Sequence, residues 1–178
     1  PPTLAQPRFT PRNAFAVHSK DGGKTWKKPI FIGRKGNEDF SEPTAIVLPG
    51  NKVITLVRND NSGYLQQVES TDGGQTWGPV RPTLIWGCPA HLLAIADGRL
   101  LATYGHRRPP YSIRACVSDD EGKIWQNSRE IVIRDVPTAN LGYPVTIEYR
   151  PGKLFTIYYA EDGSSVTCIQ GSYWDAPS

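Results

Sequence analysis

Short runs of β-branched and apolar residues recur along the whole chain, separated by turns rich in Gly, Pro, Asn and Asp. This pattern is typical of strands joined by tight turns, and no stretch shows sustained helical periodicity. We therefore predict an all-β fold of about thirteen strands. The expected strands lie at residues 13–18, 29–32, 44–48, 53–57, 65–69, 80–84, 90–96, 100–104, 112–117, 130–133, 145–149, 154–159 and 166–170.

One octapeptide, Ser-x-Asp-x-Gly-x-Thr-Trp, occurs at residues 19–26 and 70–77, and again at 118–125 with Ile124 in place of Thr. A period near fifty residues indicates a repeat architecture. The Ser, Asp and Thr side chains can bond the backbone of a turn, and the Gly residues tolerate positive φ. We predict that each octapeptide is a peripheral hairpin turn, part of the scaffold, with its large apolar Trp mostly buried.

Composition narrows the class of protein further. The chain has 178 residues with 17 Gly and 16 Pro, which is enough for one domain of short strands. The net charge of +3 is modest and the basic residues are scattered, so no nucleic-acid surface is indicated. No apolar run is long enough to span a membrane. Free thiols and no metal site are expected, because no metal-ligand spacing joins Cys88, Cys116, Cys168, His18, His91 and His106.

The octapeptide resembles the Asp-box of sialidases (neuraminidases) and related BNR repeat proteins. The resemblance implies a β-propeller whose blades are four-stranded antiparallel sheets, with one box between the third and fourth strands of each blade. The chain would be a single domain, 1–178, equivalent to the C-terminal half of a six-bladed ring. Its expected parts are a partial blade at 1–33, blades at 40–86 and 88–135, and a partial blade at 140–178. The chain starts with Pro and contains no Met, so we expect a processed product or part of a longer protein.

The resemblance also implies candidate site residues. Ser-Glu-Pro-Thr at 41–44 and Leu-Val-Arg-Asn at 56–59 are similar to the sialidase segment that carries a site Glu and Arg, here Glu42 and Arg58. Tyr158 falls where the family has its nucleophilic tyrosine. Each of these residues has a structural alternative: a core tyrosine, a loop Glu, or a solvated strand-end Arg. A third carboxylate-binding arginine is expected among Arg107, which we favour, Arg108 and Arg114, although Arg114 could equally be structural.

These residues would perform the chemistry of a retaining exo-α-sialidase without a cofactor. Several arginine forks would bind the substrate carboxylate, and a tyrosine nucleophile paired with a Glu would avoid the repulsion that an anionic nucleophile meets. The first arginine and the general-acid Asp of the family have no counterpart in this chain. The alternative is therefore a non-catalytic propeller module that binds glycans or proteins, and a third possibility is a purely structural unit.

Several expectations about partners follow. The resemblance implies a sialoside-like glycan substrate and a location outside the cytoplasm, extracellular or periplasmic. We expect no nucleic-acid or membrane partner. Because about three blades cannot close a ring alone, we also expect that two copies related by a two-fold axis form a six-bladed homodimer.

Overall fold

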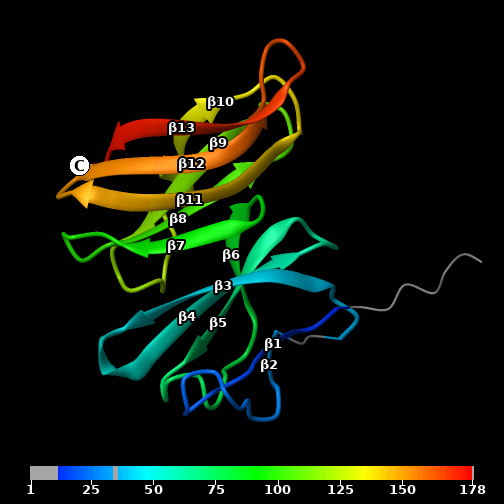
Figure 1. The fold of residues 1–178 in the computed structure, drawn as a ribbon, viewed down its shortest axis with the longest axis vertical. Helices are drawn as coiled ribbons and strands as arrows, with labels where there is room; N and C mark the ends of the chain where they lie inside the picture. The colour runs from blue at the N-terminus through cyan, green and yellow to red at the C-terminus, as the bar shows by residue number, and fades with distance from the viewer. Residues whose placement is uncertain (1–11, 34–35, 178) are drawn as a thin grey trace, which may run out of the picture.

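The computed structural model describes residues 12–33 and 36–177, which form four antiparallel β-sheets (Figure 1). The predicted all-β fold is confirmed. The part of the expected first blade at residues 1–11 lies outside the described residues. The strands are β1 (Ala14–Ala16), β2 (Ile30–Gly33), β3 (Phe40–Leu48), β4 (Lys52–Asn59), β5 (Tyr64–Ser70), β6 (Arg81–Trp86), β7 (Ala90–Ala94), β8 (Leu100–His106), β9 (Ser112–Ser118), β10 (Ile131–Asp135), β11 (Leu141–Arg150), β12 (Lys153–Glu161) and β13 (Thr167–Asp175), with short 3-10 turns at Pro49–Asn51 and Asn127–Arg129.

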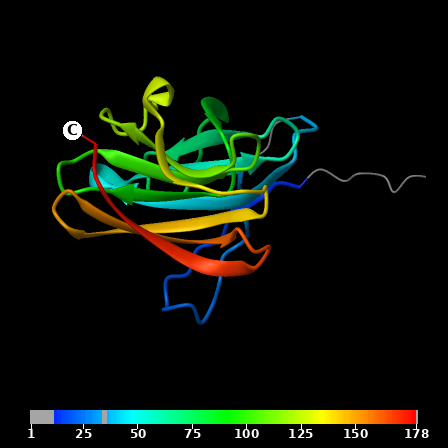
Figure 2. The same ribbon diagram turned by 90° about the horizontal axis from the view of Figure 1, so that it is seen from above.

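The four sheets follow one another in chain order. The first sheet pairs β1 with β2, the second runs β3-β4-β5-β6, the third runs β7-β8-β9-β10, and the fourth runs β11-β12-β13. Figure 1 shows the first and fourth sheets at opposite ends of the molecule, and Figure 2 shows the first-sheet hairpin projecting beyond the other sheets. Within the described chain, each sheet contains a strand pair joined by a box or a tight turn.

A hydrophobic core lies between each pair of neighbouring sheets. Alternation along the strands gives each inner sheet two apolar faces, because side chains of successive residues point to opposite sides. In β4, for example, Leu56 faces the third sheet and Val57 faces the first. The joint between the third and fourth sheets is filled in the same way, with Leu101 and Leu154 in contact from opposite sides.

The three octapeptides are hairpin turns that share the same side-chain-to-backbone bonds. In the second box, Asp72 Oδ1 accepts the Thr76 N–H at 2.9 Å and Ser70 Oγ accepts the Gly74 N–H at 2.8 Å. A further bond from the Thr76 hydroxyl to the carboxylate comes first among the causes that lower the pKa of Asp72 to about 2. The third box keeps the backbone bonds, but Ile124 has no hydroxyl to donate.

The three box tryptophans differ in burial, which corrects the prediction that all of them are buried. Trp125 is 6% exposed, Trp77 is half-buried, and Trp26 is 61% exposed. The physical reason is that Trp125 and Trp77 each pack against the sheet that precedes their own in the chain. No sheet precedes the first within the described residues, so Trp26 has no such surface.

The inner strands β3, β7 and β11 lie side by side. An X-Pro step lies near the start of each, at Glu42-Pro43 within β3, at Cys88-Pro89 just before β7 and at Tyr143-Pro144 within β11. Proline cannot donate to a ladder, and the strand register shifts at these points in β3 and β11. Glu42 and Tyr143, the residues before two of these prolines, have positive φ values, 48° and 51°. No helix among the described residues is long and apolar enough to cross a membrane.

Candidate glycan-binding site at the inner strands

Glu42 is the centre of a polar cluster where the second and fourth sheets approach each other. The register shift between Ser41 and Thr44 turns the Glu42 side chain out of the β3 ladder, as bulges commonly do. Its carboxylate accepts a hydrogen bond from Arg58 Nη1 at 2.9 Å and another from the hydroxyl of Tyr143. One carboxylate therefore links an arginine of its own sheet to a tyrosine that lies a hundred residues further along.

Arg58 is held by two carboxylates. It lies one residue before the end of β4 and pairs in register with Ser41. Its Nη1 contacts Glu42, and its Nε contacts Asp60 Oδ1 at 2.6 Å. Asp60 in turn accepts hydrogen bonds from Ser41 Oγ at 2.6 Å and from Arg12 at 2.8 Å. These bonds fix the orientation of the guanidinium while leaving about a quarter of the side chain, 26%, exposed.

Arg107 enters the cluster from the third sheet, immediately after β8. Its Nε donates to the Leu141 carbonyl at 2.8 Å, and its Nη2 donates to Tyr159 Oη at 3.0 Å. The guanidinium carbon lies 5.9 Å and 6.0 Å from the ring centres of Tyr143 and Tyr159, within cation–π range. A side chain at Gly142 would displace the Arg107 guanidinium, because its Cβ would lie 2.5 Å from Arg107 Nη2. No carboxylate of the described chain forms an ion pair with Arg107.

Electrostatics assign opposite protonation states to Glu42 and Tyr143. Partial burial raises the pKa of Glu42, but hydrogen bonds from Tyr143 and Arg58 outweigh it, so the pKa is lowered overall. The hydrogen bond to Glu42, followed by desolvation, raises the pKa of Tyr143. At neutral pH the pair is therefore a carboxylate that accepts and a neutral phenol that donates.

The structure does not bring Tyr158 to this cluster, contrary to the expected convergence with Glu42. Tyr158 is 3% exposed and lies in the core between the third and fourth sheets, where its hydroxyl bonds Ser172 Oγ at 2.8 Å. The physical reason is strand alternation, because neighbouring residues of β12 point to opposite faces. Tyr159 therefore reaches Arg107 while Tyr158 points away from it.

Among the three candidate arginines, only Arg107 contacts the cluster. Arg108 stacks over the Trp86 ring at 4.4 Å and donates from Nε to His106 Nε2 at 3.3 Å. Arg114 forms an ion pair with Glu130 at 2.8 Å, as its structural alternative implied. The structure thus brings together Glu42, Arg58 and Arg107 of the expected set.

Sequence reasoning missed Tyr143 and Tyr159 as members of this cluster. A usable signal for Tyr143 was present, since its step Tyr143-Pro144 matches the X-Pro steps at Glu42 and Cys88 in the two earlier repeats. Cys88 is a free thiol close enough to be influenced by Arg58, Arg107 and Glu42, although burial is the main cause that raises its pKa. Corresponding places in three repeats therefore face one region.

A hollow of about 380 Å³ adjoins the Glu42–Tyr143 pair. His91 lies in it, half-buried, and desolvation lowers its pKa, so the imidazole is neutral at pH 7. The hollow can hold a ligand of monosaccharide size beside a carboxylate and a phenol. The residues that line it are Glu42, Pro43, Thr44, Pro89, Ala90, His91, Tyr143, Pro144 and Val145. No group of three or more His, Cys, Asp or Glu that could hold a metal ion occurs in the described part of the chain.

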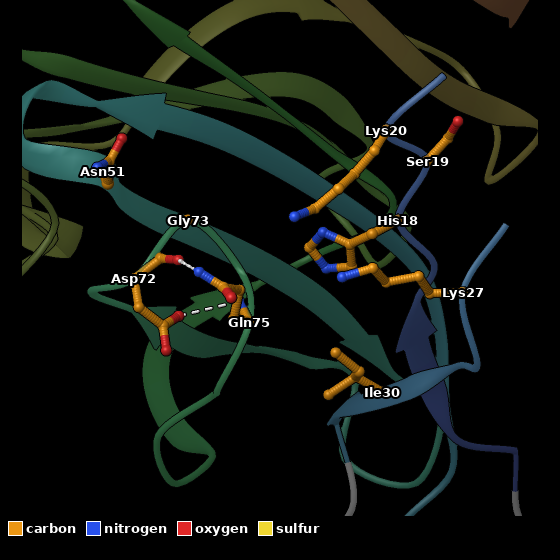
Figure 3. Close-up of a pocket in the computed structure, with 9 residues that line it drawn as sticks. All are labelled: His18, Ser19, Lys20, Lys27, Ile30, Asn51, Asp72, Gly73 and Gln75. Carbon is orange, nitrogen blue, oxygen red and sulfur yellow. Dashed lines mark hydrogen bonds between the residues drawn. The ribbon is translucent and has the colours of Figure 1, made fainter. Parts of the chain in front are cut away.

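A larger hollow, about 520 Å³, lies away from this cluster, between the first and second boxes (Figure 3). The side chains of His18, Lys20 and Lys27 point across it toward Asp72 and Gln75. His18 Nε2 lies 2.9 Å from the Gly74 carbonyl oxygen, so the hollow is part of a joint between sheets.

The fold and the boxes define a class, and the chain belongs to the family of BNR repeat-like domains, whose pattern it matches over residues 6–156. The expectation of a BNR repeat protein is therefore confirmed. No curated protein sequence matches the chain.

Solved structures with the same fold include glycoside hydrolases. A protein of unknown function from Dyadobacter fermentans is 27% identical, with a TM-score of 0.81, over 90% of this chain and 45% of that one. An endo-1,4-β-xylanase from Bacteroides thetaiotaomicron is 15% identical, with a TM-score of 0.65, over 95% of this chain and 62% of that one. An α-L-arabinofuranosidase from Fusarium graminearum is 14% identical, with a TM-score of 0.57, over 75% and 45%. The chain spans less than two thirds of the length of each of these structures.

Proposed function

We propose that this chain carries part of the active site of an exo-acting glycoside hydrolase of sialidase type. One observation carries the proposal: Glu42, Arg58, Arg107 and Tyr143 converge from three successive sheets beside a hollow of monosaccharide size. The glycoside hydrolases among the solved structures support a glycan as the ligand. The finer choice of a terminal sialoside rests on the two arginines, which fit a sugar that carries a carboxylate.

In the proposed reaction Tyr143, and not Tyr158, is the nucleophile. Glu42 takes the phenolic proton, the Tyr143 oxygen bonds to the anomeric carbon, and the glycosidic C–O bond breaks as the leaving oxygen gains a proton from a general acid. Water then attacks the anomeric carbon and gives a proton to the deprotonated general acid, the bond to the Tyr143 oxygen breaks, and Glu42 returns the proton to Tyr143. Arg107 forms no ion pair with a carboxylate of the described chain, so it is the arginine that would bind the substrate carboxylate.

The second candidate function is glycan binding without catalysis. A general acid must hold a proton near neutral pH, whereas the pKa of Glu42 is lowered and Asp60 is held in bonds to Arg58 and Ser41. This observation favours binding for a single copy of the chain. The general-acid Asp and first arginine of a complete site would come from outside these 178 residues.

Hydrolysis of fluorogenic sialosides, arabinosides and xylosides, run beside calorimetric titration of the free sugars, separates the two functions. We expect sialic acid to bind, and expect binding to be lost in Arg107→Ala. Any turnover should disappear in Glu42→Gln and Tyr143→Phe but persist in Tyr158→Phe, because the Tyr158 hydroxyl bonds Ser172 in the core, away from the cluster. Loss of turnover in Tyr158→Phe with normal folding, or binding that survives Arg107→Ala, would contradict the proposed roles. The expected location of the protein outside the cytoplasm stays a prediction, and so does the expected homodimer.

A further inference from the structure

The joint between the second and third sheets depends on a box tryptophan. Trp125, in the box of the third sheet, packs into the core of the second sheet. Its Nε1 donates to Gln67 Oε1 at 2.7 Å. The box backbone docks beside it, because the Gly122 carbonyl accepts from Gln67 Nε2 at 3.0 Å and from Arg81 Nη2 at 2.6 Å. The box of one sheet is therefore a plug that enters the preceding sheet.

The joint between the first and second sheets repeats this arrangement. Trp77, in the box of the second sheet, packs against Ile32 and Ala14 of the first. Gly74 occupies the place of Gly122, and its carbonyl oxygen lies 2.9 Å from His18 Nε2 of the first sheet. At both joints, therefore, the box tryptophan packs against the sheet that precedes its own in the chain.

The first box is built in the same way, but no sheet among the described residues precedes it. Its turn bonds match those of the second box, with Gly23 N–H to Ser19 Oγ at 2.8 Å and Thr25 N–H to Asp21 Oδ1 at 2.9 Å. Yet Trp26 is 61% exposed. A formed plug is therefore presented to solvent at the N-terminal end of the stack.

The opposite end of the stack presents an open apolar face. One face of the fourth sheet packs on the third, through Leu154 and Tyr158. The other face is apolar as well, and cross-strand pairs such as Ile147 with Phe155 and Phe155 with Tyr173 place its side chains together. No segment of the described chain covers it, and its members are 43% to 74% exposed: Val145, Ile147, Tyr149, Ile157, Ile169 and Tyr173.

We propose that the first box of one copy, with Trp26 as the plug, docks on this open face of the fourth sheet in a second copy. The two ends match in the way used at two of the internal joints, first–second and second–third, where a box tryptophan packs on the apolar face of the preceding sheet. Contiguous exposed apolar patches of this kind mark interaction surfaces. The same contact made twice about one two-fold axis closes a ring.

The length of a relative supports a second copy as the occupant. The Dyadobacter fermentans structure matches 90% of this chain with 45% of its own, so two copies of this chain correspond closely to its length. The two-fold is also the commonest symmetry of homo-oligomers. In such a ring the inner strands of the second copy would complete the wall of the hollow beside Glu42 and Tyr143.

Light scattering and sedimentation of the purified chain at micromolar concentration test the contact. The expected mass is twice 19.7 kDa for the wild type. Trp26→Ala and Ile147→Asp should each reduce it to one chain, whereas Ile124→Asp should keep the dimer, because Ile124 is also exposed, 68%, but lies outside both surfaces. Far-ultraviolet circular dichroism checks that the variants are folded.

Trp26 fluorescence gives a readout that does not depend on a disruptive variant. Dilution of the wild-type dimer should shift the tryptophan emission to longer wavelength, and Trp26→Phe should abolish that shift. A single-chain mass for the wild type, an open series of higher masses, or a dimer that survives both Trp26→Ala and Ile147→Asp would overturn the proposal.

Discussion

Replacing tryptophan by phenylalanine should change the free energy of unfolding by different amounts in the second and third boxes. Trp125 Nε1 donates to Gln67, whereas Trp77 Nε1 is buried and has no hydrogen-bond partner among the described residues. The difference has a visible cause, since Ala16 stands three residues before the first box, where Gln67 stands before the second. Ala16 packs against the same core as Trp77 but offers no side-chain acceptor.

The expected magnitudes follow from these contacts. Trp125→Phe leaves Gln67 Oε1 unpaired in a fully buried side chain, which should cost about 1–3 kcal/mol. Trp77→Phe instead removes a buried donor that has no partner, so its hydrogen-bond contribution should be about zero or slightly stabilising. Trp125→Ala should cost more, about 3–5 kcal/mol, because it also leaves a cavity.

Urea unfolding followed by far-ultraviolet circular dichroism measures these differences at one fixed protein concentration. A double-mutant cycle with Gln67→Leu should show a coupling of about 0.5–3 kcal/mol to Trp125→Phe and none to Trp77→Phe. Equal losses for the two Phe variants would refute the reasoning, because they would show that the Gln67 bond contributes nothing beyond the packing shared by both sites.

The remaining predictions concern the site and the turns. Glu42→Gln should lower the free energy of unfolding at pH 7. The difference in free energy between wild type and variant should shrink as the pH falls below 4.5, the ordinary pKa of this carboxyl, because its pKa in the folded protein is lower. A difference that stayed constant across pH in unfolding experiments would contradict this. Gly142→Ala should cost more than about 1 kcal/mol and weaken ligand binding by displacing Arg107, whereas Gly152→Ala, with open space around it, should keep binding intact in calorimetric titration. Asp72→Asn should lower the free energy of unfolding above pH 3.8, and by progressively less as the pH falls toward 2. A loss of stability that did not depend on pH would show that the turn does not need the carboxylate charge.

The strand order and the box turns could be predicted from the sequence because both depend on local chemistry. Alternation marks each strand, and the Ser and Asp side chains of the second box bond to groups within that box. Glu42 and Arg58 were predicted from the family resemblance of residues 41–44 and 56–59, and they lie on adjacent strands of one hairpin.

The tyrosines of the site could not be predicted in this way. A shift of one residue along a strand reverses the face of every side chain, so Tyr158 and Tyr159 are equivalent in pattern and opposite in place. Tyr143 depends on a register shift and a positive φ that alternation does not reveal. The exposure of Trp26 depends on a neighbouring sheet, which no pattern inside its own box can indicate.

The X-Pro steps near the starts of β3, β7 and β11 put different functional groups at corresponding places in three repeats. Backbone geometry decides where the residue before each proline lies, and the side chain at that place is a carboxylic acid in one repeat, a thiol in the next and a phenol in the last. The sequence therefore carries a different reactive group at each of these three places, while the proline that follows it is kept. Cys88 is the thiol among these three positions. A chemical label attached to it would lie beside the pair formed by Glu42 and Tyr143.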